Sequence, residues 1–98
     1  MKARIYEEVD VTDWLRGQVR AGCTQLNLQS HTFNVERPVC EWVLSAETDV
    51  LRLTEEIERL VASERARSRG VLVLGLFSFR PERWTPLEMA LFVEEAFH

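Results

Sequence analysis

The strongest hydrophobic pattern in the chain is the run from Val71 to Phe79, in which nearly every residue is apolar. Successive side chains of a strand point to opposite faces, so a strand built from this run is apolar on both faces. The pattern therefore predicts a strand over residues 71–79 that needs cover on two sides.

The segment after this run carries the signals of a helix start. Thr85 is a cap residue, Pro86 occupies the first helical position and Glu88 the third. These signals predict a helix from Pro86 to about Phe97, with three glutamates and a terminal histidine as its only polar residues. So broad an apolar surface has to be buried in the core of the domain or against another chain.

Periodicity predicts five more elements along the chain. They are a half-buried strand, a short helix, the two strands of a hairpin and a long helix, over residues 4–11, 14–20, 23–33, 39–46 and 49–68. The long helix shows one apolar stripe, and its charges run from acidic near the start to basic at the end, as the helix dipole favours.

The predicted order of elements is β-α-β-β-α-β-α, which is an α+β fold. The first six elements follow the split βαβ order, so we expect a ferredoxin-like or related mixed or antiparallel sheet with an added C-terminal helix. In the standard fold the last strand lies at a sheet edge, whereas residues 71–79 are the most apolar of all. Either the C-terminal helix or a dimer interface covers the second face, or the elements form a different mixed sheet.

Length and composition describe one folded domain. The 98 residues contain no repeat and no linker, so we expect a single domain over residues 1–98. A hydrophobic content of 46% with 29% charged residues is typical of a folded protein. The formal net charge of −4 argues against non-specific binding to nucleic acid or to anionic membranes, because both favour basic surfaces.

The expected location is the cytoplasm. The first residues show no apolar stretch of a secretory signal, and no apolar run approaches the roughly 20 residues of a membrane span. Two cysteines, Cys23 and Cys40, are too few for a disulfide scaffold, so we expect reduced thiols.

Residues suited to chemistry are sparse. Cys23, His31 and Cys40 are separated by seven and eight residues, a spacing that matches no zinc signature, and no glycine-rich phosphate loop is present. We therefore expect no metal, no cofactor and no catalytic residue, and an enzyme is the less favoured class. The alternative is a dimeric ferredoxin-like domain that binds a small ligand or performs minor chemistry, with His31, Cys40 and Trp42 as candidates.

A third alternative is binding of nucleic acid. An arginine cluster beside a tryptophan binds phosphates and bases, and this pattern occurs at Arg80, Arg83 and Trp84. The basic end of the long helix precedes the strand 71–79, and the second group of arginines follows it. The two groups are therefore expected at opposite ends of the sheet and not in one basic patch.

The leading hypothesis is a small, non-enzymatic protein–protein interaction module, acting as an adaptor, an inhibitor or an assembly subunit. One candidate surface is the predicted C-terminal helix, through Met89, Phe92, Val93 and Phe97. The other is the uncharged face of the strand 23–33, which would bind a partner or add a strand if it lies at an edge, through Gln25, Asn27, Gln29 and His31. The partner is expected to be another protein chain, as a homodimer or a hetero-complex.

Overall fold

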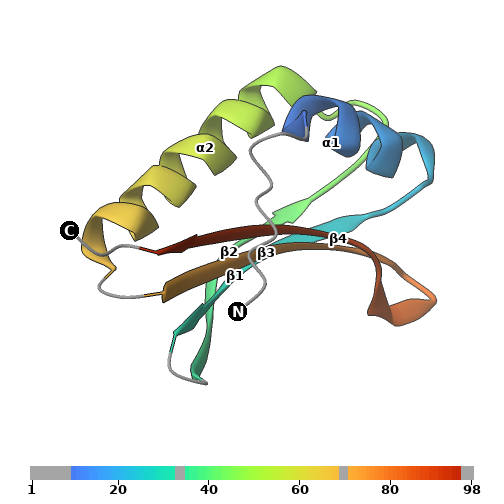
Figure 1. The fold of residues 1–98 in the computed structure, drawn as a ribbon. Helices are drawn as coiled ribbons and strands as arrows, with labels where there is room; N and C mark the ends of the chain where they lie inside the picture. The colour runs from blue at the N-terminus through green and yellow to red at the C-terminus, as the bar shows by residue number, and fades with distance from the viewer. Residues whose placement is uncertain (1–9, 33–34, 69–70, 96–98) are drawn as a thin grey trace.

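A computed structural model of the chain describes residues 10–32, 35–68 and 71–95. These residues form an α+β fold with two helices and one four-stranded antiparallel sheet (Figure 1). The elements, in chain order, are α1 (Val11–Arg20), β1 (Gln25–Thr32), β2 (Val35–Val43), α2 (Val50–Arg67), β3 (Val71–Arg80) and β4 (Arg83–Glu95).

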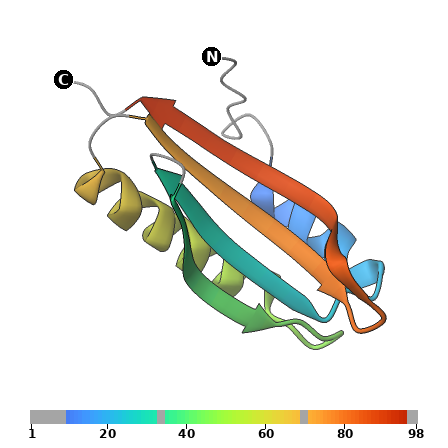
Figure 2. The same cartoon turned by 90° about the horizontal axis from the view of Figure 1, so that it is seen from below.

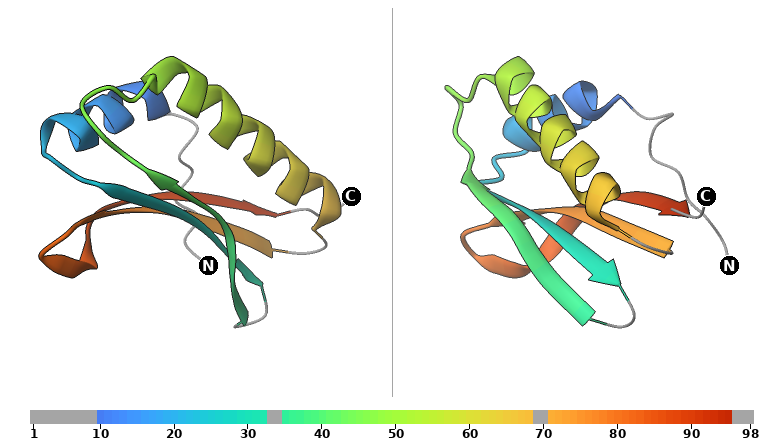
Figure 3. Two further views of the ribbon diagram at one scale, coloured as in Figure 1. Left: turned by 180° about the vertical axis from the view of Figure 1, so that it is seen from behind. Right: turned by 90° about the vertical axis from the view of Figure 1, so that its left-hand side faces the viewer.

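The sheet is made of two hairpins placed side by side. Its strand order is β2-β1-β3-β4, so β1 and β3 are the inner strands, and β2 and β4 the edges. Both helices lie on one face of the sheet (Figures 1 and 3). Figure 2 looks onto the other face, which no helix or strand of the described residues covers.

The core lies between the helices and the sheet. Its side chains come from alternate positions of the inner strands, from β4, from the inward stripe of α2 and from α1, and include Leu15, Leu26, Leu28, Leu53, Ile57, Val61, Leu72, Leu74, Leu76 and Ala90. The long helix and the hairpin are confirmed, and Asp49 caps α2 by accepting a hydrogen bond from the backbone nitrogen of Arg52 at 3.2 Å. The second hairpin strand begins earlier than predicted, at Val35.

The predicted C-terminal helix is wrong, because the chain from Arg83 to Glu95 forms strand β4. It pairs with β3 in a continuous register from Val71↔Glu95 to Ser78↔Glu88. Both alternating sets of residues in this segment are apolar, so the two-residue period of a strand is hidden. Pairing with β3, continuous from Glu88 to Glu95, overrides the local helix signals at Thr85 and Pro86. Phe97 lies outside the described residues.

The start of the chain also differs from the prediction. Residues 4–9 of the expected first strand lie outside the described residues, and Val11, expected to end that strand, begins α1. The helix starts one turn early because Asp10 caps it, accepting from the backbone nitrogens of Thr12 at 2.9 Å and Asp13 at 3.4 Å. The described order is α-β-β-α-β-β, so the ferredoxin-like order is not confirmed.

The layered packing makes the inner face of β3 the most sensitive part of the fold. Leu76 is fully buried, whereas Leu51 on the outer side of α2 is 60% exposed. We expect Leu76→Ala to lower the free energy of unfolding by about 2–5 kcal/mol, because it leaves a cavity in a close-packed core. Leu51→Ala serves as the control and should change it by less than about 0.5 kcal/mol. Urea unfolding measures both values, and equal losses would contradict the layer assignment.

Candidate functional site

The sheet surface that faces away from α1 and α2 is called the open face. Strand β3 shows best how residues divide between the two faces. Leu72, Leu74 and Leu76 belong to the buried core. Val73 and Phe77, which occupy the alternate positions of the strand, are only partly buried and do not belong to it. Because side chains alternate along a strand, this second set lies on the open face.

One half of the open face, over β3 and β4, is apolar. Register pairs Phe77 with Met89 and Gly75 with Leu91 across the two strands, and Met89 is 50% exposed. A Cβ atom at Gly75 would lie 2.7 Å from the Phe77 ring and 3.5 Å from Leu91, so the ring occupies the space above this glycine. The apolar half consists of Val73, Phe77, Phe79, Met89 and Leu91.

The other half, over β1 and β2, is polar and ends in carboxylates. The predicted polar set of β1 does share one face, and there the side-chain amide of Gln25 donates to the Oδ1 of Asn27 at 3.1 Å. His31 faces Glu36 across the hairpin, with 3.6 Å between Nε2 and Oε1. Glu41 pairs with Asn27, and both glutamates are exposed. The polar half is therefore a column of neutral polar side chains on β1. It is bordered on β2 by Glu36 and Glu41, which alternate with Pro38 and the exposed Val43.

The expectation that the polar strand lies at an edge does not hold, because β1 is hydrogen-bonded on both sides, to β2 and β3. A strand from another chain therefore cannot pair with β1 and could add only to the edge strands β2 and β4. Edge strand β2 contains Pro38 and a register shift opposite Leu28 and Gln29, features that disfavour further pairing. Edge strand β4 keeps an unshifted register with β3 from Glu88 to Glu95.

The four residues assigned to the predicted helix surface do not stay together. Met89 lies on the open face, whereas Phe92 packs against the core on the helix side. Val93 is at a β4 position paired with Val73, and Phe97 lies outside the described residues. The structure therefore joins Met89 to the polar set of β1 on one surface, two sets that the sequence assigned to separate surfaces.

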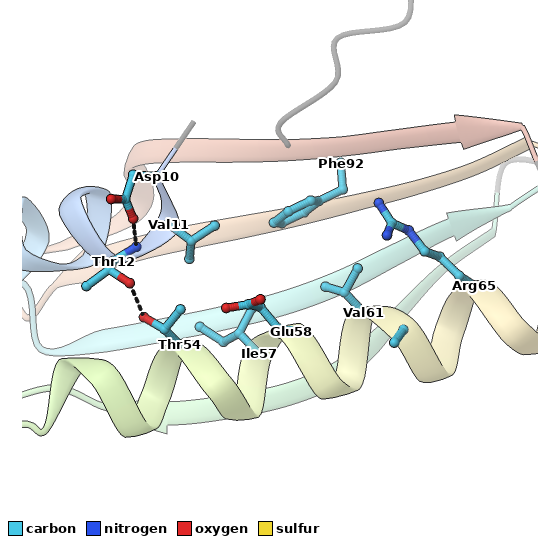
Figure 4. Close-up of a pocket in the computed structure, with 10 residues that line it drawn as sticks. Asp10, Val11, Thr12, Thr54, Ile57, Glu58, Val61, Arg65 and Phe92 are labelled. Carbon is cyan, nitrogen blue, oxygen red and sulfur yellow. Dashed lines mark hydrogen bonds between the residues drawn. The ribbon is translucent and has the colours of Figure 1, made fainter. Parts of the chain in front are cut away.

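A groove of about 500 Å³ lies on the opposite side of the sheet, between α2, β4 and the start of α1 (Figure 4). Its floor is apolar, with Phe92 from β4 facing Ile57 and Val61 from α2. Its two threonine hydroxyls are engaged within the fold: the Thr12 hydroxyl donates to that of Thr54 at 3.1 Å, and Thr54 donates to a backbone carbonyl of α2 at 2.8 Å. The lining of the groove thus combines an apolar floor with charged side chains, those of Asp10, Glu58 and Arg65.

The candidates for simple chemistry are separated by the sheet. Cys40 lies opposite core residue Leu28 and therefore faces the helices, whereas His31 lies on the open face, so they cannot form a thiol–imidazole pair. Burial and then the charge of Glu56 raise the pKa of the Cys40 thiol above its ordinary value of 9.0. Trp42 also faces α2, where its ring nitrogen donates to Glu56 at 3.0 Å.

The arginine and tryptophan candidates lie at the β3–β4 hairpin. Arg80 turns back to α1 and donates to the carbonyl of Ala21 at 2.7 Å. Arg83 is exposed, and Trp84 is 77% exposed. The basic end of α2 lies near the start of β3 and the hairpin at its end, so the two groups of arginines are apart (Figure 1).

One buried carboxylate has a shifted pKa but a structural explanation. The side chain of Glu64 is 4% exposed and is hydrogen-bonded by Arg37 of β2 and, at 2.7 Å, by Arg67. Burial by itself raises the pKa of Glu64, but the hydrogen bond from Arg67 and the charge of Arg37 outweigh it, so the pKa lies below its ordinary value of 4.5. This cluster ties β2 to α2.

Among the described residues, no group of three His, Cys, Asp or Glu side chains is placed to hold a metal ion. None of the helices in that part of the chain is long and apolar enough to cross a membrane. Comparisons with protein-family models, with curated proteins and with solved structures found no match to this chain.

The sequence missed Phe77, Phe79 and Leu91 as surface residues. The signal was present in the two-faced apolar pattern of residues 71–79, whose second face was expected to be covered by the C-terminal helix or by a dimer interface. The open face, with its apolar half and its acid-bordered polar half, is the candidate functional site.

The raised pKa of Cys40 gives a direct test of the thiol as a nucleophile. In a Cys23→Ala variant, we expect Cys40 to react with a disulfide reagent at pH 7 more slowly than free cysteine, because less thiolate is present. The rate should climb as the pH rises towards and beyond 9. A rate above that of free cysteine at pH 7 would show an activated thiol and contradict this assignment.

The lowered pKa of Glu64 predicts a pH dependence of stability. Glu64 takes up its proton at a higher pH in the unfolded chain than in the folded protein. Its ionised form therefore stabilises the fold fully above the unfolded pKa near 4.5. This contribution is lost as the pH falls through the lower folded pKa. The free energy of unfolding of Glu64→Gln should therefore fall less between pH 7 and pH 3 than that of the wild type, measured by urea unfolding. Glu58→Gln, an exposed position on the same helix, should keep the wild-type slope.

Proposed function

We propose that this protein is a small, non-enzymatic interaction module that binds another protein chain through its open face. The observation that carries the proposal is the group of large apolar side chains around Phe77 and Met89, on a face left uncovered by the described residues. Contiguous apolar surface on a folded domain marks sites of association, because its burial against a partner is favourable. Adaptor, inhibitor and assembly subunit are all roles that such a surface serves.

The size of the open face is compatible with this role. Four strands spaced about 4.8 Å apart and about eight residues long present roughly 19 by 26 Å, or about 500 Å² in projection. A standard protein interface buries about 800 Å² on each partner. The open face supplies most of that area, and the edge of β4 next to Met89 and Leu91 extends it.

The other functions left open by the sequence have weaker support. Minor chemistry at His31 and Cys40 would need the two side chains together, and they lie on opposite faces of the sheet. Of the residues suggested for nucleic acid, Arg80 is engaged with the carbonyl of Ala21, which leaves Arg83 and Trp84 as the exposed pair. The proposal includes a cytoplasmic location, which two cysteines outside any disulfide favour.

The test compares three forms of the protein as bait in native lysate of the source organism, together with the solution mass of each. Phe77→Thr/Met89→Thr removes the centre of the apolar half while keeping residues suited to a strand. Leu51→Gln removes an exposed apolar side chain from the outer side of α2 and is the control. We expect the double variant to lose proteins that the wild type and the control retain, or to lose a dimer that they form.

A second variant changes the same surface at the backbone position beneath the Phe77 ring. Gly75→Ala introduces a Cβ that meets the far end of the Phe77 ring and displaces it. The core on the helix side is untouched, so the midpoint of unfolding should change little while association weakens. Identical captured proteins and identical masses for all four forms would contradict the proposed function.

A further inference from the structure

The open face carries an ordered gradient of chemistry across its four strands. One row of register partners runs Glu41, Asn27, Phe77, Met89, and a second runs Glu36, His31, Val73, Val93. Each row therefore passes from a carboxylate on β2, through a neutral polar residue on β1, to apolar positions on β3 and β4. The two other rows begin on β2 at Pro38 and Val43, so Glu36 and Glu41 alternate with apolar residues along that border.

The charge of this surface has one sign. Arg37, the arginine of β2, turns to the helix side and bonds Glu64, and Arg80 at the end of β3 bonds the carbonyl of Ala21 at α1. The strand segments 25–31, 36–43, 71–79 and 87–92 place Glu36 and Glu41 on the open face and no lysine or arginine there. A partner that complements the face must therefore combine an apolar strip with positive charge on one flank.

Dimensions indicate the form of the occupant. A helix with its axis above β3 extends about 5–6 Å to either side, over β1 and β4, and long basic side chains on its flank would point towards β2, which lies about 10 Å from β3. The apolar half from Val73 to Phe79 spans about 20 Å, the length of a helix of about 13 residues. A helix laid along β3 would place its apolar stripe on Phe77, Met89 and Leu91 and its flank above β1 and β2.

We propose, building on the proposed function, that the open face binds an amphipathic α-helix of a partner protein, with lysine or arginine along the flank that faces β2. The helix would complete a three-layer arrangement in which β3 is covered on both sides. The basic flank would pair with Glu36 and Glu41, both exposed at the border. A second copy of this chain is the weaker occupant, because its own open face brings the same carboxylates and no cation.

The test uses two synthetic peptides of about 18 residues that are helical and share one apolar stripe of leucine. One carries lysine along one flank and the other carries glutamate at the same positions. Fluorescence anisotropy measures their affinity for the full chain. We expect the lysine peptide to bind at least about tenfold more tightly than the glutamate peptide, and this preference to shrink as salt is added.

Two charge variants locate the contact. Glu36→Lys/Glu41→Lys should reverse the preference in favour of the glutamate peptide. Glu47→Lys/Glu55→Lys changes the net charge equally at exposed positions away from the open face, and should retain the preference for lysine. Phe77→Thr/Met89→Thr should weaken the binding of both peptides, because it removes the apolar strip of the open face that both would contact.

Several results would overturn this assignment of the partner. The first two are equal affinity for the two peptides and binding of neither. The third is an identical response of the two charge variants. The fourth is a wild-type dimer in light scattering that becomes a monomer in the double variant Phe77→Thr/Met89→Thr. The last result would assign the face to a second copy. In each case the proposed function still stands if the double variant loses natural partners or the dimer, so the two ideas fail independently.

Discussion

Strand β3 is the element on which the rest of the structure depends, because it is paired along both edges and is apolar on both faces. Its pairing with β1 and β4 places it inside the sheet, where the backbone groups of an apolar segment find partners. Leu74 and Leu76 then fill the space beneath the helices, while Val73 and Phe77 are turned the other way. A single strand thus supplies both the core of the domain and the centre of its surface.

The helix layer is fixed to one side of the sheet by specific polar contacts as well as by packing. Ser78 of β3 donates to the side-chain oxygen of Gln18 in α1 at 2.5 Å, and both residues are buried. At the other end, Glu64 of α2 holds Arg37 of β2. Buried polar groups that lose a partner are costly, so these contacts favour one placement of the helices. That placement leaves the open face free to act as a surface.

The distribution of charge follows the same division into two sides. Arg37 and Arg67, and the carboxylate of Glu64 that they contact and whose pKa is lowered, lie on the helix side, where they stabilise the fold. Within strand segments 25–31, 36–43, 71–79 and 87–92, the carboxylates of the open face are Glu36 and Glu41, and the other side chains on that face are neutral or apolar. An acidic border beside an apolar strip gives a surface that selects its partner by charge and gains affinity from apolar burial.

The sequence by itself determined the elements whose signals are local. The cap at Asp49 and the apolar stripe gave α2, and strict alternation gave the strand β1 with its polar face. Only the tertiary structure decided that residues 83–95 form a strand, because apolar residues on both faces hide the period and the hydrogen-bond partners lie on β3. It also decided that Met89 joins Gln25 and Asn27 on one surface while Phe92 leaves it. That β1 and β3 become neighbours is set by packing between distant segments, and no local pattern of residues records it.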